Sequence, residues 1–176
     1  NCSYRFTQVG RRVSVVDDRL HLRALGLYAR LPTWARRRVV RTIAPAFTVG
    51  AICLIERPDD SVLLVRQVYR RHWGIPGGLL QRGEEPADAA RRELMEEIGL
   101  AVDLIGEPAV VVDAEAQRVD VVYRARPSAG TDPDSVVPES PEIAEVQWFP
   151  RSELPDLKEE TVQALVALSR GDVGQF

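Results

Sequence analysis

Lysine is nearly missing from this chain of 176 residues, which has one, Lys158, against 22 arginines. We attribute this bias to genome base composition. Cysteine is also scarce: Cys2 and Cys53 lie far apart in the sequence and do not form a CxxC pair. The chain therefore shows neither a disulfide framework nor the cysteine spacing of a zinc site. Cys53 falls within an apolar run, and we expect it to be a buried strand residue.

Long hydrophobic runs and a large net charge are absent as well. No apolar stretch approaches the roughly 20 residues that span a membrane as a helix, and no secretory h-region opens the chain. The net charge of −3 gives no overall attraction to nucleic acid. These absences predict a cytoplasmic protein without a membrane span, for which nucleic acid is an unfavoured partner.

One segment, residues 78–100, combines glycines and acidic residues at a fixed spacing. It begins at Gly78, continues through Glu84, and ends with the string Arg92-Glu93-Leu94-Met95-Glu96-Glu97-Ile98-Gly99-Leu100. Pro86 suits the first turn of a helix, and Gly99 suits its left-handed end. At about 100° per residue, the carboxylates of Glu93, Glu96 and Glu97 share one face of this helix. A separate apolar face is left to pack on a sheet.

Three carboxylates on one helix face have two interpretations. The first is a solvated acidic helix in which Arg92 pairs with Glu96. The second is a site for a hard divalent cation, because Mg²⁺ takes carboxylate oxygens together with waters and phosphate oxygens. Gly77 and Gly78 in the preceding turn favour the second interpretation, since paired glycines let backbone groups approach a metal ion or a pyrophosphate closely.

The same segment fills every position of the pattern G-x5-E-x7-R-E-U-x-E-E-x-G-U, in which U is a bulky aliphatic residue, and so resembles the Nudix box. The resemblance implies a hydrolase that cleaves a nucleoside diphosphate linked to another moiety, or a related nucleotide. It also implies that Mg²⁺ or Mn²⁺ is bound by Glu93, Glu96 and Glu97, with the Gly77 carbonyl as a further ligand and Glu84 as support. Arg92 would orient Glu93. Glu142, on a later loop, is a candidate for an extra metal ligand or the catalytic base.

The layout of apolar runs predicts an α/β fold, and the resemblance implies an α/β/α sandwich with a mixed β-sheet. We expect strands at residues 47–55, 62–67, 102–105, 110–112, 119–124 and 145–149, and in a stretch that ends at Trp73. A last helix is expected over residues 158–170. Residues 46–176 would form this catalytic domain.

The preceding segment, residues 1–45, has a different composition. Residues 1–41 carry ten arginines against two acids, Asp17 and Asp18. The pattern predicts two helices, residues 18–31 and 32–44. Their many apolar positions favour packing on the catalytic domain or on a partner chain, as in a homodimer, over binding to lipid or nucleic acid.

The substrate is less clearly indicated than the fold. Arg66 and Arg70 precede the glycine turn and are candidates for binding substrate phosphates, because arginine presents a fork that fits them. Signatures that mark several Nudix subgroups are missing downstream of the box, which weakens each of those assignments. Two alternatives to the nucleotide hydrolase stay open: a nucleotide-sensing module without turnover, and an RNA 5′-end pyrophosphohydrolase that uses the basic N-terminal segment.

Overall fold

The computed structural model describes residues 29–43 and 46–172 of the chain. The chain divides into two compact units, Asn1–Ala46 and Phe47–Phe176. In the first unit, helix α2 (Thr33–Ile43) lies within the predicted 32–44 helix. The other predicted helix, residues 18–31, lies outside the described residues except for its last three. The packing of this segment on the catalytic domain or on a partner chain therefore stays a prediction.

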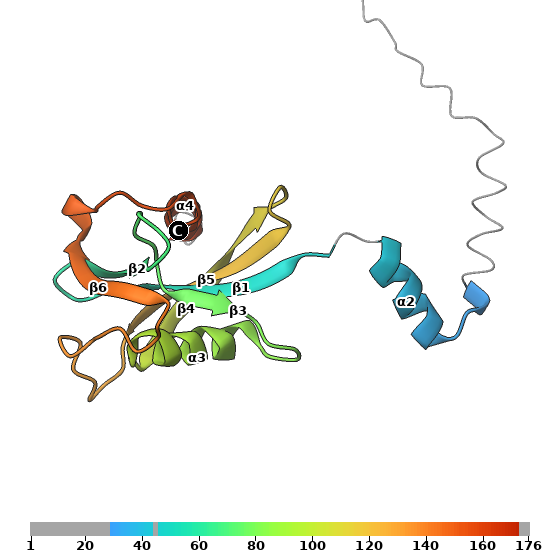
Figure 1. The fold of residues 1–176 in the computed structure, drawn as a ribbon, viewed down its shortest axis with the longest axis horizontal. Helices are drawn as coiled ribbons and strands as arrows, with labels where there is room; N and C mark the ends of the chain where they lie inside the picture. The colour runs from blue at the N-terminus through green and yellow to red at the C-terminus, as the bar shows by residue number, and fades with distance from the viewer. Residues whose placement is uncertain (1–28, 44–45, 173–176) are drawn as a thin grey trace, which may run out of the picture. The chain divides into compact units, whose positions relative to one another are not determined.

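A mixed four-stranded sheet forms the centre of the second unit (Figure 1). Its strand order is β3 (Gly77–Leu79), β1 (Thr48–Ile55), β5 (Arg118–Pro127) and β4 (Val102–Asp113). Strands β1 and β5 pair in parallel, whereas the other two pairings are antiparallel. Strands β2 (Ser61–Gln67) and β6 (Ile143–Pro150) form a separate antiparallel pair. A short 3₁₀ turn, η1 (Arg151–Glu153), follows β6.

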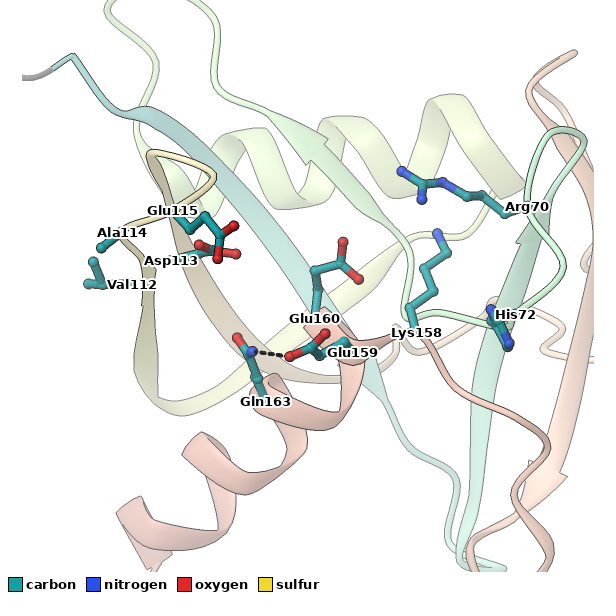
Figure 2. A pocket seen from close by; sticks show the side chains of 10 residues that line it. All are labelled: Arg70, His72, Val112, Asp113, Ala114, Glu115, Lys158, Glu159, Glu160 and Gln163. Carbon is teal, nitrogen blue, oxygen red and sulfur yellow. Dashed lines mark hydrogen bonds between the residues drawn. The ribbon is translucent and has the colours of Figure 1, made fainter.

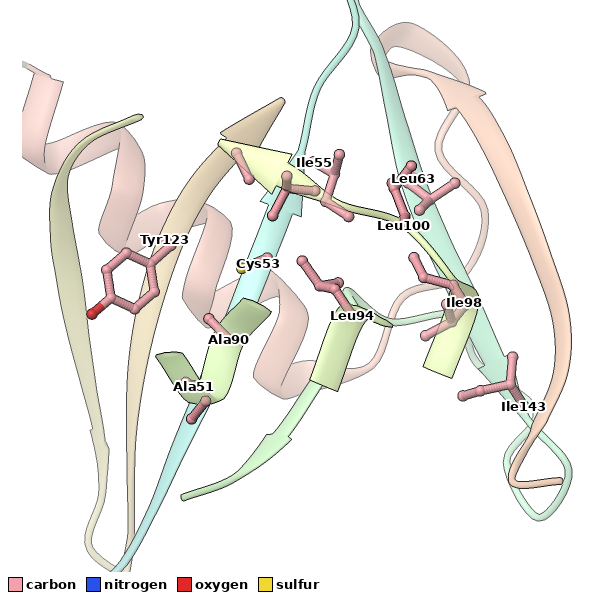
Figure 3. Close-up of a cluster of buried hydrophobic side chains, with 14 residues drawn as sticks. Ala51, Cys53, Ile55, Leu63, Ala90, Leu94, Ile98, Leu100, Tyr123 and Ile143 are labelled. Atoms are coloured by element: carbon pink, nitrogen blue, oxygen red, sulfur yellow. The ribbon is translucent and has the colours of Figure 1, made fainter. Parts of the chain in front are cut away.

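Two helices cover the two faces of the central sheet, α3 (Pro86–Ile98) on one and α4 (Glu159–Asp172) on the other (Figure 1). Strand β1 serves both faces because side chains alternate along a strand. Its residues Ala51, Cys53 and Ile55 pack with Ala90 and Leu94 of α3 (Figure 3). Its residues Ile52 and Leu54 pack instead with Ala164 and Leu168 of α4. The predicted α/β/α sandwich with a mixed sheet is confirmed.

Helix α3 begins and ends where its sequence indicates. Pro86 occupies the first turn. Gly99 adopts φ 65° and ψ 20°, and the helix cap donates backbone N–H hydrogen bonds to carbonyl groups in the last turn. A residue without a Cβ enters this left-handed conformation at little cost. Leu94 and Ile98 are buried under the sheet, and burial of each such side chain stabilises the fold by roughly 1.5–3 kcal/mol. The apolar face of α3 thereby fixes which way its acidic face points.

The strands of the structure differ from the expected ones at three places, two near the glycine turn and one in β4. The stretch before Trp73 is not a strand, because residues 68–72 form a turn and bends and Trp73 makes only an isolated bridge with Leu157. The short strand β3 was missed, since a three-residue strand with two glycines carries no periodicity. Residues 102–105 and 110–112 belong to one strand, β4, with a register shift between Ile105 and Ala109. Within the described residues, no helix is long and apolar enough to cross a membrane.

Candidate active site

The acidic face of α3 borders a hollow of about 430 Å³ that lies against β3 and β5. Two of the three predicted carboxylates, those of Glu93 and Glu97, line this hollow. The Glu96 carboxylate is directed elsewhere, with 58% of its side chain exposed. We refer to this hollow as the catalytic hollow; its other charged lining comes from Arg70, Arg118, Asp120, Glu142, Lys158 and Glu160.

Glu97 is the most buried acid of the helix, with 9% of its surface exposed. The Gly77 N–H donates to its Oε2 at 2.9 Å. The pKa of Glu97 is raised to about 7, mainly by burial and also by the charges of Glu93 and Glu142, against the opposing effects of the Gly77 hydrogen bond and of Lys158. A carboxylate in this position gains a great deal from a nearby cation, because water screens its charge poorly.

Glu93 lies directly over Gly78. A Cβ built on Gly78 would come within 2.4 Å of the Glu93 carboxylate. Arg92 Nη1 donates to Glu93 Oε1 at 2.7 Å. The glycine turn therefore leaves room for this carboxylate at the wall of the hollow, and the neighbouring arginine holds it there.

Arg92 ties the glycine turn to the helix. Its Nε and Nη2 donate to the two oxygens of Glu84 at 2.7 and 2.9 Å, and its Nη1 also reaches Glu96 at 3.0 Å. The paired guanidinium, followed by the Gln81 N–H, lowers the pKa of the Glu84 carboxyl to about 2. A bidentate pair of this kind is geometrically specific as well as charge-assisted. Arg92 thus contacts Glu93, as the Nudix resemblance implies, and also Glu96, as the interpretation of a solvated acidic helix predicts.

The donors that face the hollow suit a hard divalent cation. Glu93 and Glu97 offer carboxylate oxygens, and Gly78 leaves the space beside them free. Among the described residues, no three acidic, histidine or cysteine side chains already converge as a metal site. Mg²⁺ does not require such a cage, since it keeps several waters and takes oxygens from substrate phosphates. In this arrangement Glu96 would have to leave Arg92 to join the other two carboxylates.

The remaining predicted site residues divide into two groups. Glu142, on the loop before β6, and Arg70, in the turn after β2, both line the catalytic hollow. Arg66 does not line it, because its Nη2 pairs with Glu145 Oε1 on β6 at 2.5 Å. A contact between Arg66 and substrate stays a prediction that the observed pairing does not favour.

Several polar residues of the hollow were not foreseen, among them Arg118, Asp120 and Lys158. Asp120 on β5 is 5% exposed, and Arg118 Nε donates to both of its carboxylate oxygens at 2.8 Å. Gly50 makes room for it, since a Cβ there would lie 2.2 Å from Asp120 Oδ1. The sequence signal that could have identified Asp120 as a site residue is its charge inside the apolar run of β5. Lys158, just before α4, carried no local signal other than being the single lysine of the chain.

Comparison with known proteins bears on the family of this chain. A family model described as NUDIX domain matches residues 46–168. A MutT-like protein of Streptomyces ambofaciens is 28% identical over 113 residues, which cover 64% of this chain and 70% of that protein. A putative 8-oxo-dGTP diphosphatase 3 of Mycobacterium tuberculosis is 33% identical over 116 residues, which cover 61% of this chain and 54% of that protein. The matched region is thus about half the length of the second relative.

A solved structure also resembles this chain. The crystal structure of a NUDIX hydrolase from Nitrosomonas europaea is 26% identical, with a TM-score of 0.62 and coverage of 74% of both chains. The family model covers well over half of the chain, and its match contains both the glycine turn and helix α3. The chain therefore belongs to the Nudix hydrolase family.

Proposed function

We propose that this protein hydrolyses a phosphoanhydride bond in a nucleoside diphosphate linked to another moiety, or in a related nucleotide, with the help of Mg²⁺ or Mn²⁺. The observation that carries this proposal is the placement of Glu93 and Glu97 on one wall of a single hollow. Relatives described as diphosphatases support the same reaction class.

Glu93 and Glu97 would hold the cation, with Glu96, the Gly77 carbonyl and Glu84 as further candidates. When bound, such a cation neutralises phosphate oxygens and lowers the pKa of a coordinated water. The roles of the chain's own residues follow from their positions. Arg92 keeps Glu93 at the wall through its 2.7 Å hydrogen bond.

A proton must leave the attacking water, and two carboxylates of the hollow are placed to accept it. Glu93 is held rigidly by Arg92, whereas Glu142 sits on an exposed loop at the same hollow. A base works best when its position is fixed relative to the nucleophile. We therefore assign proton acceptance to Glu93 and treat Glu142 as the alternative.

The test is a screen of nucleotides for products released in the presence of Mg²⁺ or Mn²⁺. The set should include nucleoside diphosphate sugars, ADP-ribose, nucleoside triphosphates, dinucleoside polyphosphates and capped RNA. We expect release of a nucleoside monophosphate, or of pyrophosphate from a triphosphate, that EDTA abolishes. Binding without turnover of any member would instead favour a nucleotide-sensing module. Turnover restricted to capped RNA, with steep salt dependence, would favour the RNA 5′-end enzyme.

Arg92→Lys should weaken turnover without unfolding the protein. Lysine keeps the charge but lacks the fork that holds Glu84, Glu93 and Glu96 together. We expect kcat/KM to fall by roughly 10- to 100-fold, as is typical when a residue that supports metal ligands is removed. The pKa of Glu84, followed by carboxyl NMR, should rise from about 2 toward its ordinary range.

The matched control for that variant is Arg91→Lys. Arg91 is its exposed neighbour on α3 and contacts Asp88 at 3.4 Å, away from the catalytic hollow. Its replacement should leave kcat/KM within a factor of two. Equal losses in the two variants would show that the loss does not come from the contacts of Arg92 with Glu84, Glu93 and Glu96.

A further inference from the structure

A second hollow, of about 600 Å³, adjoins the catalytic hollow and is not used by the proposed reaction (Figure 2). Arg70, Lys158 and Glu160 line both hollows, so the two meet along these three side chains. We call the second one the outer hollow. The rest of its polar lining comes from His72, Asp113, Glu115, Glu159 and Gln163. A ligand whose diphosphate lies in the catalytic hollow can therefore continue into the outer hollow.

Lys158 stands at the junction and is held on several sides. Its Nζ donates to Gln67 Oε1 on β2 at 2.7 Å, and its main-chain N–H donates to the Trp73 carbonyl at 2.8 Å. Its aliphatic stem lies on Gly74, where a Cβ would come within 3.1 to 3.2 Å of three side-chain atoms of Lys158. The chain thus directs the ammonium group of its single lysine to the boundary between the two hollows.

The positive charge at the junction is not matched by an ion pair. Among the described residues, neither Lys158 nor Arg70 forms a salt bridge with a carboxylate. Burial lowers the pKa of Lys158, and the charge of Arg70 lowers it further, against weaker opposing effects that include Glu160 and Glu97. An anion placed between Lys158 and Arg70 would relieve the repulsion between these two cations.

The opposite wall of the outer hollow is acidic. Asp113 and Glu115 lie at the β4–β5 hairpin, and Glu159 opens helix α4, followed by Glu160, which reaches the junction (Figure 2). Figure 2 shows these carboxylates on one side and the basic side chains of Arg70, Lys158 and His72 on the other. Ionised carboxylates accept hydrogen bonds from hydroxyl groups. They also repel a further phosphate, which carries the same sign of charge.

We propose that the outer hollow is the subsite for the group joined to the diphosphate, with Lys158 and Arg70 binding the phosphate at the junction and the acidic wall binding hydroxyls of a neutral sugar. This inference rests on the proposed function and narrows its substrate class. It favours a nucleoside diphosphate linked to a sugar over a nucleoside triphosphate, whose terminal phosphate would meet the acidic wall.

The first test fills the outer hollow. Ala114 is an exposed residue that lines it at the hairpin, and Ala114→Trp would occupy the space without touching the catalytic hollow. The control is Ala116→Trp, since Ala116 is exposed in the same hairpin but does not line the hollow. We expect wild-type kcat/KM to be at least tenfold higher for a nucleoside diphosphate hexose than for the matching triphosphate. Ala114→Trp should raise KM for the hexose compound at least tenfold, and Ala116→Trp should change it less than twofold.

The second test measures binding and does not depend on turnover. Because the chain has one lysine, an amine-reactive reagent labels a single side chain besides the terminal amine, and mass spectrometry separates the two sites. A non-hydrolysable α,β-methylene analogue of the nucleoside diphosphate hexose should slow the labelling of Lys158 at least fivefold. Free hexose at the same concentration should not. Lys158→Gln should weaken binding of the analogue at least tenfold, and Lys158→Arg should recover part of that loss.

The outcomes separate the two proposals. Absence of metal-dependent hydrolysis of every nucleotide overturns the proposed function, whereas the labelling and binding measurements still test the subsite. Unchanged Lys158 labelling in the presence of the analogue overturns the subsite. A wild-type preference for the triphosphate, or an equal effect of Ala114→Trp on both substrates, overturns it as well.

Discussion

Glu93→Gln and Glu97→Gln should each lower kcat at saturating Mg²⁺ by roughly 10²- to 10³-fold, the usual cost of removing one group that stabilises charge in the transition state. Both side chains face the catalytic hollow, and neither belongs to the apolar face of α3. The amide keeps the shape of the side chain but removes the charge that would attract a divalent cation. The fold should therefore survive, as measured by circular dichroism.

Glu85→Gln is the control for this pair. Glu85 is the exposed N-cap residue of the same helix, and its side chain makes no capping hydrogen bond. Its replacement should leave kcat within a factor of two. Near-normal turnover of both hollow variants with Mg²⁺ saturating would contradict the assignment of Glu93 and Glu97 as metal ligands.

Glu97→Gln should lower activity, but it should raise the stability of the metal-free protein at pH values above 7. Its pKa is about 7 in the folded state against 4.5 for the free side chain, so the folded state binds this proton more tightly than the unfolded state. The associated stability is fully present below pH 4.5 and is lost as pH rises through 7. At 1.36 kcal/mol per pKa unit, the loss is on the order of 3 kcal/mol.

Urea unfolding with EDTA at pH 5 and pH 8 measures this effect. Wild-type protein should be less stable at pH 8 than at pH 5, and Glu97→Gln should show a smaller difference. At pH 8 the metal-free variant should be the more stable of the two. A wild-type protein that gains stability over this range to the same extent as the variant would show that Glu97 ionises at its ordinary pKa.

Alanine at the two glycines of the turn should give two different defects. Gly77 adopts φ +136°, and a Cβ there would lie 2.3 Å from the Ala51 carbonyl oxygen of β1. Because backbone cannot move out of the way cheaply, Gly77→Ala should lower the free energy of unfolding by on the order of 3 kcal/mol. A Cβ on Gly78 meets instead the carboxylate of Glu93 at 2.4 Å, the far end of a flexible side chain.

Gly78→Ala should accordingly keep most of the stability and lose most of the activity, since Glu93 must leave its position. Gly83→Ala is the reference for conformation alone, because Gly83 has φ +82° but no atom within 4 Å of the added Cβ. Its cost should stay near 1 kcal/mol. Urea midpoints and kcat of the three variants provide the comparison. An active Gly78→Ala protein would show that the turn does not position Glu93.

Helix α3 is the part of the site that the local sequence determined. Pro86, Gly99 and the spacing of the apolar residues define where the helix lies and which face it buries. The same spacing places Glu93, Glu96 and Glu97 on the other face. The positions of strands β1, β2 and β5 could be predicted for a similar reason, since an apolar, β-branched run is also a property of neighbouring residues.

The tertiary structure alone decided how those carboxylates differ. Glu97 is buried under Gly77, whereas Glu96 stays exposed on Arg92, although they are adjacent in the sequence. It also decided that Asp120 and Lys158 meet the helix at one hollow, from strands and loops far along the chain. The physical reason is one of range. Helical periodicity and end signals depend on residues a few positions apart, whereas desolvation, pKa and the lining of a hollow depend on whatever the rest of the fold packs against a side chain.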